Sequence, residues 1–157
     1  MVPVTLEPLS PKRLPKWLRR STEEYASDLV SMGQSPAEAH RQATRIMENS
    51  FPGGRPASGH FVFDVHDGPG RPVGSLWIGR AAGKDDGAWW VWDISINESE
   101  RGQGLGRETM LAAEQFARSH HARTLGLSVF GFNTVARQLY ESLDYETTEI
   151  KMVKALG

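Results

Sequence analysis

The chain has 157 residues, a length that fits one domain, so we expect residues 1–157 to form a single domain. Its 18 Lys and Arg residues nearly balance its 19 Asp and Glu residues, and a net charge of −1 does not favour nucleic acid as a partner. The sequence contains no Cys, which excludes disulfides, thiolate metal sites and a Cys nucleophile, and it has no apolar run long enough to cross a membrane.

The first half of the chain predicts a short strand, two helices and a hairpin. Prolines flank the strand over residues 3–9. Apolar residues at helical spacing predict helices over 14–32 and 36–51, and a Pro/Gly cluster follows the second one. Period-two patterns over 60–66 and 72–80, joined by a turn rich in Gly and Pro, predict the hairpin.

The second half predicts a strand, a glycine-rich loop, a helix, a strand, a helix and a last strand. These elements cover residues 89–96, 97–106, 107–120, 123–130, 133–143 and 146–153. The complete order is β-α-α-β-β-β-α-β-α-β. This order predicts an α/β fold with a mixed, mostly antiparallel central sheet, in which a right-handed crossover makes the strands 89–96 and 123–130 parallel.

The glycine loop "RGQGLG" lies between the strongest predicted strand and a helix. Gly102, Gly104 and Gly106 lack a Cβ, so backbone N–H groups can turn toward one point and a ligand can approach closely. The N-terminus of the following helix adds free N–H groups, and together these favour a diphosphate. A flexible entry to the helix is the structural alternative. The loop lacks the Gly-Lys-Ser/Thr of the Walker pattern and the G-x-G-x-x-G spacing of the Rossmann fingerprint.

Two segments carry a resemblance to a known family. "DISINESERGQGLG" resembles motif A of the Gcn5-related N-acetyltransferase (GNAT) superfamily, R/Q-x-x-G-x-G/A. "LSVFGFNTVARQLYESLDYE" resembles the next motif of that family, N-x-x-A-x-x-L-Y-x-x-x-G-F/Y, although Asp144 stands where Gly is usual. The residues that match are Arg101, Gly104, Gly106, Asn133, Ala136, Leu139, Tyr140 and Tyr145.

The resemblance implies that acetyl-CoA is the co-substrate and lies between two parallel strands that splay apart, here 89–96 and 123–130. The backbone of Ile94, Ser95 and Ile96 would pair with the pantetheine arm, and an N–H near Ile94 would polarise the thioester carbonyl. Asn133 and Ala136 would lie near the same arm, and Asn133 also suits a helix cap. The amides that would receive the pyrophosphate belong to Arg101, Gly102, Gln103, Gly104, Leu105, Gly106 and Arg107.

The resemblance also implies catalytic roles. The hydroxyl of Tyr140 would protonate the departing thiolate, and the alternative is a Tyr that only packs in the core. An amine acceptor must lose a proton, and Asp93 is the first candidate for the base, with Glu98 as the second. Strict alternation places Trp89, Val91 and Asp93 on one face of a strand, where apolar surroundings raise the pKa of a carboxyl. A structural Asp and a solvated Glu are the alternatives.

The acceptor itself is not readable from the sequence. In the family it lies between the first two helices and the central strands, which makes Glu24, Tyr25 and His60 candidate contacts. The five His residues show no ligand spacing, so we expect no metal. A short chain favours a small-molecule amine, while an amino acid and a protein Lys or N-terminus stay open.

We expect direct transfer in a ternary complex by a cytoplasmic protein without a secretory signal, and without nucleic-acid or membrane partners. A homodimer stays open. A non-catalytic acyl-CoA-binding sensor is the alternative function, and it would have no need of the Tyr140 hydroxyl.

Overall fold

The computed structural model describes residues 3–83 and 85–157. The strands are β1 (Thr5–Pro8), β2 (His60–His66), β3 (Gly74–Arg80), β4 (Ala88–Ile96) and β5 (Thr124–Leu127). The helices are α1 (Leu14–Ser31), α2 (Pro36–Ser50), α3 (Leu105–Ser119) and α4 (Thr134–Ser142), with short 3-10 turns η1 (Pro52–Gly54) and η2 (Glu98–Glu100). None of the described helices is long and apolar enough to span a bilayer.

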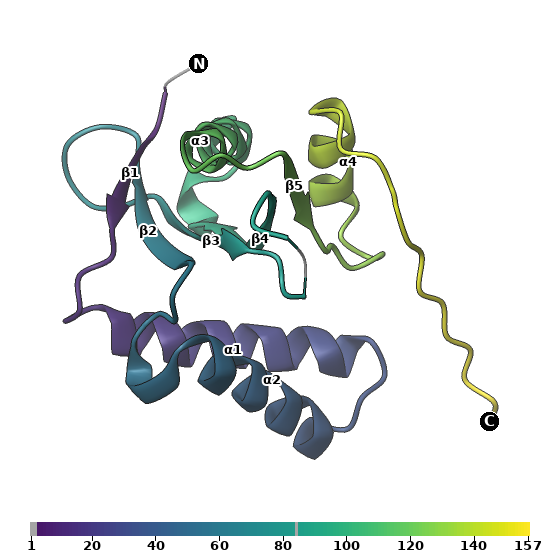
Figure 1. The fold of residues 1–157 in the computed structure, drawn as a ribbon. Helices are drawn as coiled ribbons and strands as arrows, with labels where there is room; N and C mark the ends of the chain where they lie inside the picture. The colour runs from purple at the N-terminus through teal and green to yellow at the C-terminus, as the bar shows by residue number, and fades with distance from the viewer. Residues whose placement is uncertain (1–2, 84) are drawn as a thin grey trace.

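One mixed sheet organises the molecule. Its strands lie in the order β1-β2-β3-β4-β5. The pairings from β1 to β4 are antiparallel, whereas β4 and β5 run parallel. Figure 1 shows α1 and α2 on one face of the sheet and α3 on the other. The α/β fold, the mixed sheet and the parallel pair predicted from the sequence are therefore confirmed.

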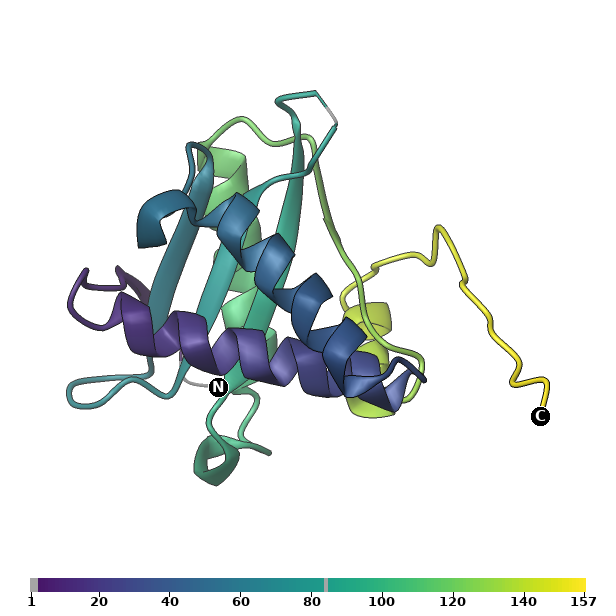
Figure 2. The same cartoon turned by 90° about the horizontal axis from the view of Figure 1, so that it is seen from below.

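Each face of the sheet has its own core. On the α3 face, apolar residues of β2, β3 and β4 pack against Leu105, Met110, Ala113 and Ala117. On the α1 face, Trp17 packs edge-on against Trp77 and Phe51. The Trp17 indole N–H also donates to the Ser75 hydroxyl at 3.1 Å, which satisfies a buried polar pair. Figure 2 shows α1 and α2 crossing the strands from this side.

The C-terminal part differs from the prediction. The segment 146–153 forms no strand, and in the structure it is an extended segment outside the sheet. A strand pattern marks a segment that suits a sheet edge, but a strand forms only when a partner strand is beside it. The parallel strand is also shorter than predicted, Thr124–Leu127 instead of 123–130. In the helix predicted over 133–143, Val135 is 79% exposed, and α4 lies at the margin of the sheet.

Candidate active site

A bulge in β4 sets the direction of the candidate base. Trp77 of β3 lies opposite Asp93, while the next residue, Ile78, lies opposite Val91, so Trp92 is the extra residue. Val91 belongs to the core on the α3 face, whereas Trp92 stacks on Trp77 on the α1 face. The prediction that Trp89, Val91 and Asp93 share one face is therefore wrong. The bulge interrupts the alternation and turns Asp93 toward α1.

Beyond this bulge, β4 has a partner on only one side. Its parallel pairing with β5 ends at Val91, opposite Leu127. Ile94, Ser95 and Ile96 continue to pair with β3, and nothing in β5 pairs with them. The two parallel strands therefore separate where the family resemblance predicts it. The free edge of β4 is the kind of backbone surface on which an extended ligand adds like a short strand.

The glycine loop follows this free edge and leads into α3. Gly102 and Gly104 have φ angles of +81° and +79°, and Gly104 occupies the N-cap of α3. The amides of residues 102–107 donate to no backbone acceptor among the described residues, and the first amide that does so is that of Glu108, to Gly104. A loop of free N–H groups at the positive end of a helix is a site for an anion.

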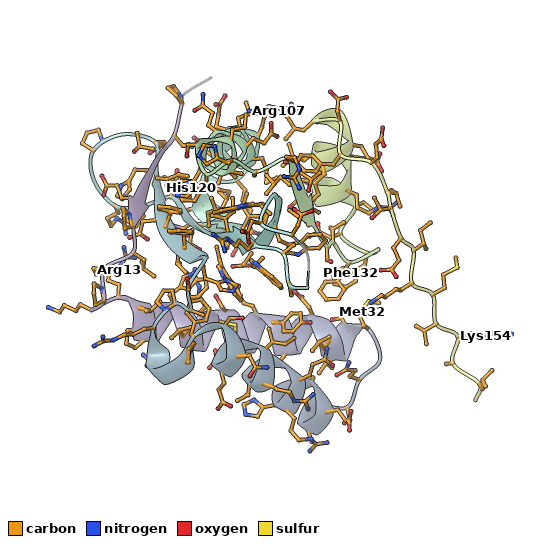
Figure 3. All side chains as sticks on the ribbon, viewed as in Figure 1. Arg13, Met32, Arg107, His120, Phe132 and Lys154 are labelled. Atoms are coloured by element: carbon orange, nitrogen blue, oxygen red, sulfur yellow. The ribbon has the colours of Figure 1, made fainter. Side chains whose placement is uncertain are left out.

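The other residues of this loop position it. The Arg101 guanidinium donates to the Ile96 carbonyl at 3.0 Å, which ties the loop to the end of β4. A Cβ on Gly106 would lie 3.3 Å from the side chain of Leu139, so this glycine allows α3 and α4 to approach each other closely. Arg107, labelled in Figure 3, donates to the Ser142 hydroxyl of α4 at 2.5 Å. The loop is therefore coupled to α4.

Helix α4 is held at both ends. The Asn133 side chain accepts from the Ala136 N–H at 3.3 Å and so caps the helix, as one of its two predicted roles requires. At the other end Asp144 has a φ of +68° in a Schellman-type turn, with its own N–H bonded to Glu141 and that of Tyr145 bonded to Tyr140. Asp tolerates this left-handed conformation, which explains why it can replace the usual Gly.

Asp93 lies in a setting that favours a neutral carboxyl. Burial, together with the carboxylates of Glu24 and Asp28, raises its pKa to about 6 against the opposing charge of Arg20. All three of these neighbours come from α1. Asp93 is therefore poised near neutral pH, which is the range that suits a general base.

Tyr140 lies close enough to Asp93 for the two groups to interact. Burial raises the pKa of its hydroxyl, and the charge of Asp93 raises it further. Its ring packs against the core on the α3 face and meets Tyr145 edge-on, with ring centroids 6.1 Å apart. The hydroxyl forms no hydrogen bond with another described residue, whereas that of Tyr145 donates to Glu114 at 3.1 Å. The predicted acid and the predicted base are thus within electrostatic reach of each other.

The α1 side of the site contains the residues predicted to contact the acceptor. Glu24 lies within electrostatic reach of Asp93, and Tyr25 follows it, half-buried, on the same helix. His60 lies on the same face of the sheet, where its ring packs 5.7 Å from both Trp77 and Trp92. Its Nδ1 accepts from the Trp77 indole at 3.0 Å, and burial lowers its pKa, so the ring is neutral.

Sequence reasoning missed Asp28. It lies one helical turn after Glu24, and this spacing places both carboxylates on one side of α1. Burial raises the pKa of Asp28 as well. The one-turn spacing of Glu24 and Asp28 was the feature of the sequence that could have identified Asp28. Glu98, the second candidate base, is exposed in η2 and does not appear among the groups that act on Asp93.

No three His, Asp or Glu side chains within 3–83 and 85–157 are arranged to hold a metal ion. Two shallow depressions lie on the outer side of the helix pair, around His40, and contain none of the motif residues.

Comparison with known proteins agrees with this geometry. The profile of the acetyltransferase (GNAT) family matches residues 17–145. Two Bacillus subtilis relatives, the uncharacterized N-acetyltransferases YycN and YdgE, are 28% and 27% identical and cover 98% and 97% of the chain, and 99% and 98% of their own lengths. The crystal structure of YycN superposes with a TM-score of 0.90 over 98% of each chain. AAC(6')-Iy, solved with a CoA-containing bisubstrate analogue, shares the fold at 14% identity, with a TM-score of 0.60 over 97% of each chain.

Proposed function

The chain belongs to the acetyltransferase (GNAT) family, and from this premise we propose that it moves the acetyl group of acetyl-CoA to a primary amine by direct transfer in a ternary complex. Transfer of an acyl group is the activity of the family.

The free amides of residues 102–107, adjoining the unpaired edge of β4, carry the proposal. Coenzyme A contains a pyrophosphate and an amide-rich arm, and these two groups match an anion loop followed by a free strand edge. The arm would pair with Ile94, Ser95 and Ile96, and the pyrophosphate would lie on the loop. The fit rests on this chain's own backbone, and the CoA-containing analogue bound to AAC(6')-Iy supports it by likeness of fold.

Two side chains supply the proton transfers. Asp93, with its pKa near 6, accepts a proton from the acceptor ammonium and leaves a neutral amine that can attack the acyl carbon. Tyr140, whose raised pKa keeps its hydroxyl protonated, donates a proton to the departing sulfur. The attacking nitrogen must lose a second proton to become an amide, and this proton restores the Tyr140 hydroxyl. The proton on Asp93 leaves to solvent, so both side chains return to their starting states. Both groups act at one place because the bulge turns Asp93 toward α1 and α4 brings Tyr140 to it.

The acceptor we propose is a small cationic amine. The charges of Glu24 and Asp28 act on Asp93 from α1, with Arg20 as the opposing charge, and a protonated amine fits such surroundings. The aromatic rings of Trp77 and Trp92 stack beside this region and supply an apolar wall. A protein Lys or N-terminus is the second candidate acceptor, since it carries the same ammonium group.

The experiment is a panel of amines incubated with the protein and acetyl-CoA, with release of free thiol as the readout. We expect thiol release with small primary amines and none with their N-acetylated forms. Binding is measured separately by thermal unfolding. Acetyl-CoA at 100 times its dissociation constant should stabilise the fold by about 2.7 kcal/mol, and adenine nucleotides should do far less. An unfolding temperature that millimolar acetyl-CoA leaves unchanged would refute the proposal.

A further inference from the structure

The imidazole ring of His60 uses one of its two nitrogens within the protein. Its Nδ1 accepts the indole N–H of Trp77 at 3.0 Å, and because an indole N–H can only donate, Nδ1 carries no proton. Burial lowers the pKa of the ring, which is therefore neutral at pH 7 and carries its proton on Nε2. Nε2 has no hydrogen-bond partner in residues 3–83 and 85–157, and the half-buried ring leaves it within reach of a ligand.

The surroundings of His60 hold its ring in one orientation. The ring centroids of Phe51, Trp77 and Trp92 lie 6.4, 5.7 and 5.7 Å from that of His60. Gly79 of β3 pairs with His60, and a Cβ on this glycine would lie 3.1 Å from Nδ1. The glycine therefore leaves room for the ring to lie over β3 and reach Trp77. A donor that is held in place before a ligand arrives loses little conformational entropy on binding.

This face of the sheet offers hydrogen-bond donors and lacks acceptors for them. The indole N–H of Trp92, whose ring packs beside that of His60, is buried and has no acceptor within the described part of the chain. Leaving a buried N–H unpaired costs free energy, so native structures pair most of them. The Trp92 N–H and the His60 Nε2–H are thus two neighbouring donors without partners. The group that would complete this face is an oxygen, which the described residues do not supply.

The free donor lies on the side of the sheet where the proposed transfer takes place. Asp93 follows Trp92 along β4, and Trp77, the hydrogen-bond partner of His60, lies opposite Asp93 in the register of β3 and β4. His60 in β2 and Asp93 in β4 are two strands apart, which is about 10 Å. Figure 2 shows α2 crossing this face obliquely, so that the ends of the strands beyond it have no helix in front of them. A molecule whose nitrogen lies at Asp93 would reach His60 with its other end.

The charges of the site decide which kind of oxygen suits this position. The carboxylates of Glu24 and Asp28 act on Asp93, so a ligand that brought another carboxylate would be repelled. The His60 ring carries no charge with which to offset that repulsion, since burial lowers its pKa. A hydroxyl, an ether or an amide carbonyl accepts a hydrogen bond without adding charge. These surroundings therefore favour a neutral oxygen.

We propose that the His60 Nε2–H binds a neutral oxygen at the far end of an elongated acceptor amine, and that Trp77 positions this donor by fixing the tautomer of the ring. This role of His60 rests on the proposed function, because it takes the reacting nitrogen to lie at Asp93. His60 touches none of the reacting atoms, so it determines specificity and leaves the chemical steps to Asp93 and Tyr140. The substrate class is thus an amino alcohol, an amino ether or an amine that bears an amide.

A pair of amines that differ in one group tests this specificity. In 6-aminohexan-1-ol a hydroxyl stands where heptylamine has a methyl group, so the two molecules have the same length. The measured quantity is kcat/KM for the amino alcohol divided by kcat/KM for the alkylamine, a ratio that does not depend on how much of a variant is folded. We expect His60→Phe to lower this ratio about tenfold, through KM, because a neutral hydrogen bond is lost.

Three further variants separate recognition of the oxygen from packing. His60→Gln retains a side-chain N–H and should keep most of the discrimination between the two amines. His40→Phe introduces a Phe at an exposed position of α2 and should leave the ratio unchanged. Trp77→Phe keeps an aromatic ring but removes the hydrogen bond that fixes the tautomer, so it should lower the ratio as well.

Nuclear magnetic resonance observes the donor without any reaction. The His60 signals in long-range ¹H–¹⁵N spectra are those that His60→Gln lacks. They should show the proton on Nε2 in the wild type and on either nitrogen in Trp77→Phe. Coenzyme A replaces acetyl-CoA in these samples, so that no acetyl group is transferred. Adding 6-aminohexan-1-ol should then shift the Nε2 signal, and heptylamine should not.

The outcomes distinguish this role of His60 from the proposed function. If both amines are acetylated and the ratio is the same in the wild type and in His60→Phe, the role of His60 is refuted and the proposed function stands. If neither amine is acetylated while the amino alcohol shifts the Nε2 signal, the role is supported and the proposed transfer fails for these acceptors. An Nε2 signal that neither amine shifts would refute the role, as would a wild-type ring with its proton on Nδ1.

Discussion

The carboxyl of Asp93 couples the stability of the protein to pH. Its pKa is about 6 in the folded protein and 3.8 for an ordinary Asp, so the folded state holds the proton more tightly than the unfolded chain does. This proton binding stabilises the fold fully below pH 3.8, and the contribution is lost as the pH rises through about 6. Above that pH, the folded protein carries a buried carboxylate at a cost.

Asp93→Asn removes the charge and should therefore stabilise the protein at pH 8 but not at pH 4. A pKa difference of two units corresponds to about 3 kcal/mol, which sets the scale of the gain. Urea unfolding at the two pH values measures it. Asp86→Asn, at a side chain that is 88% exposed, is the control and should change little at either pH. Equal effects of Asp93→Asn at both pH values would mean that the carboxyl does not titrate near 6.

Removal of the Tyr140 hydroxyl distinguishes an enzyme from a non-catalytic acyl-CoA-binding sensor. Tyr140→Phe keeps the ring and its packing, so kcat should fall about 100-fold or more while the KM for acetyl-CoA changes little. The loss should be smaller with an acyl donor whose thiol is more acidic. Steady-state kinetics with an accepted amine measures both parameters.

Tyr145→Phe is the matched control for this prediction. It removes the hydrogen bond to Glu114, so it should lower stability by about 1 kcal/mol and leave kcat unchanged. Full activity of Tyr140→Phe would point to water as the proton source. A joint loss of stability and activity in that variant would indicate that Tyr140 serves the core.

At the level of elements, the loop between β4 and α3 has two roles: it begins a helix and, in the proposed function, it binds a ligand. Gly104 has the left-handed backbone that begins α3, and it lies among the free amides that we propose bind the pyrophosphate. A side chain there affects both. A substitution at a second glycine, with a similar backbone but no role in the site, separates the effect on the backbone from the effect on ligand binding.

Gly104→Val should weaken acetyl-CoA binding at least tenfold, about 1.4 kcal/mol, because the side chain blocks the approach to the loop. Gly33→Val is the control: its φ is +103°, so the backbone strain is comparable, and it lies in the turn between α1 and α2. Calorimetry should find normal affinity in that variant. Unchanged affinity in a folded Gly104→Val protein would mean that the glycine serves only the turn.

Much of the secondary structure of this protein follows from local residue preferences, which act over a few positions along the chain. Helical spacing located α1, α2 and α3, and period two located β2, β3 and β4. The spacing of glycines in residues 101–106 and the motif around Tyr140 indicated the family and its site, because a turn, a helix start and an amphipathic helix each need particular residue types in order.

The tertiary structure decided the rest, because it depends on partners that lie far away in the sequence. The bulge at Trp92 arises from pairing with β3, and only that pairing shows that Asp93 lies on the α1 side of the sheet and not in the core around Val91. On that side the charges of Glu24 and Asp28 act on it. The segment 146–153 has the composition of a strand, yet hydrogen bonding to a neighbour makes a strand, and its own sheet supplies none. Residue preferences determine which conformations a segment can adopt at low free-energy cost. Contacts with distant elements then select the conformation that forms.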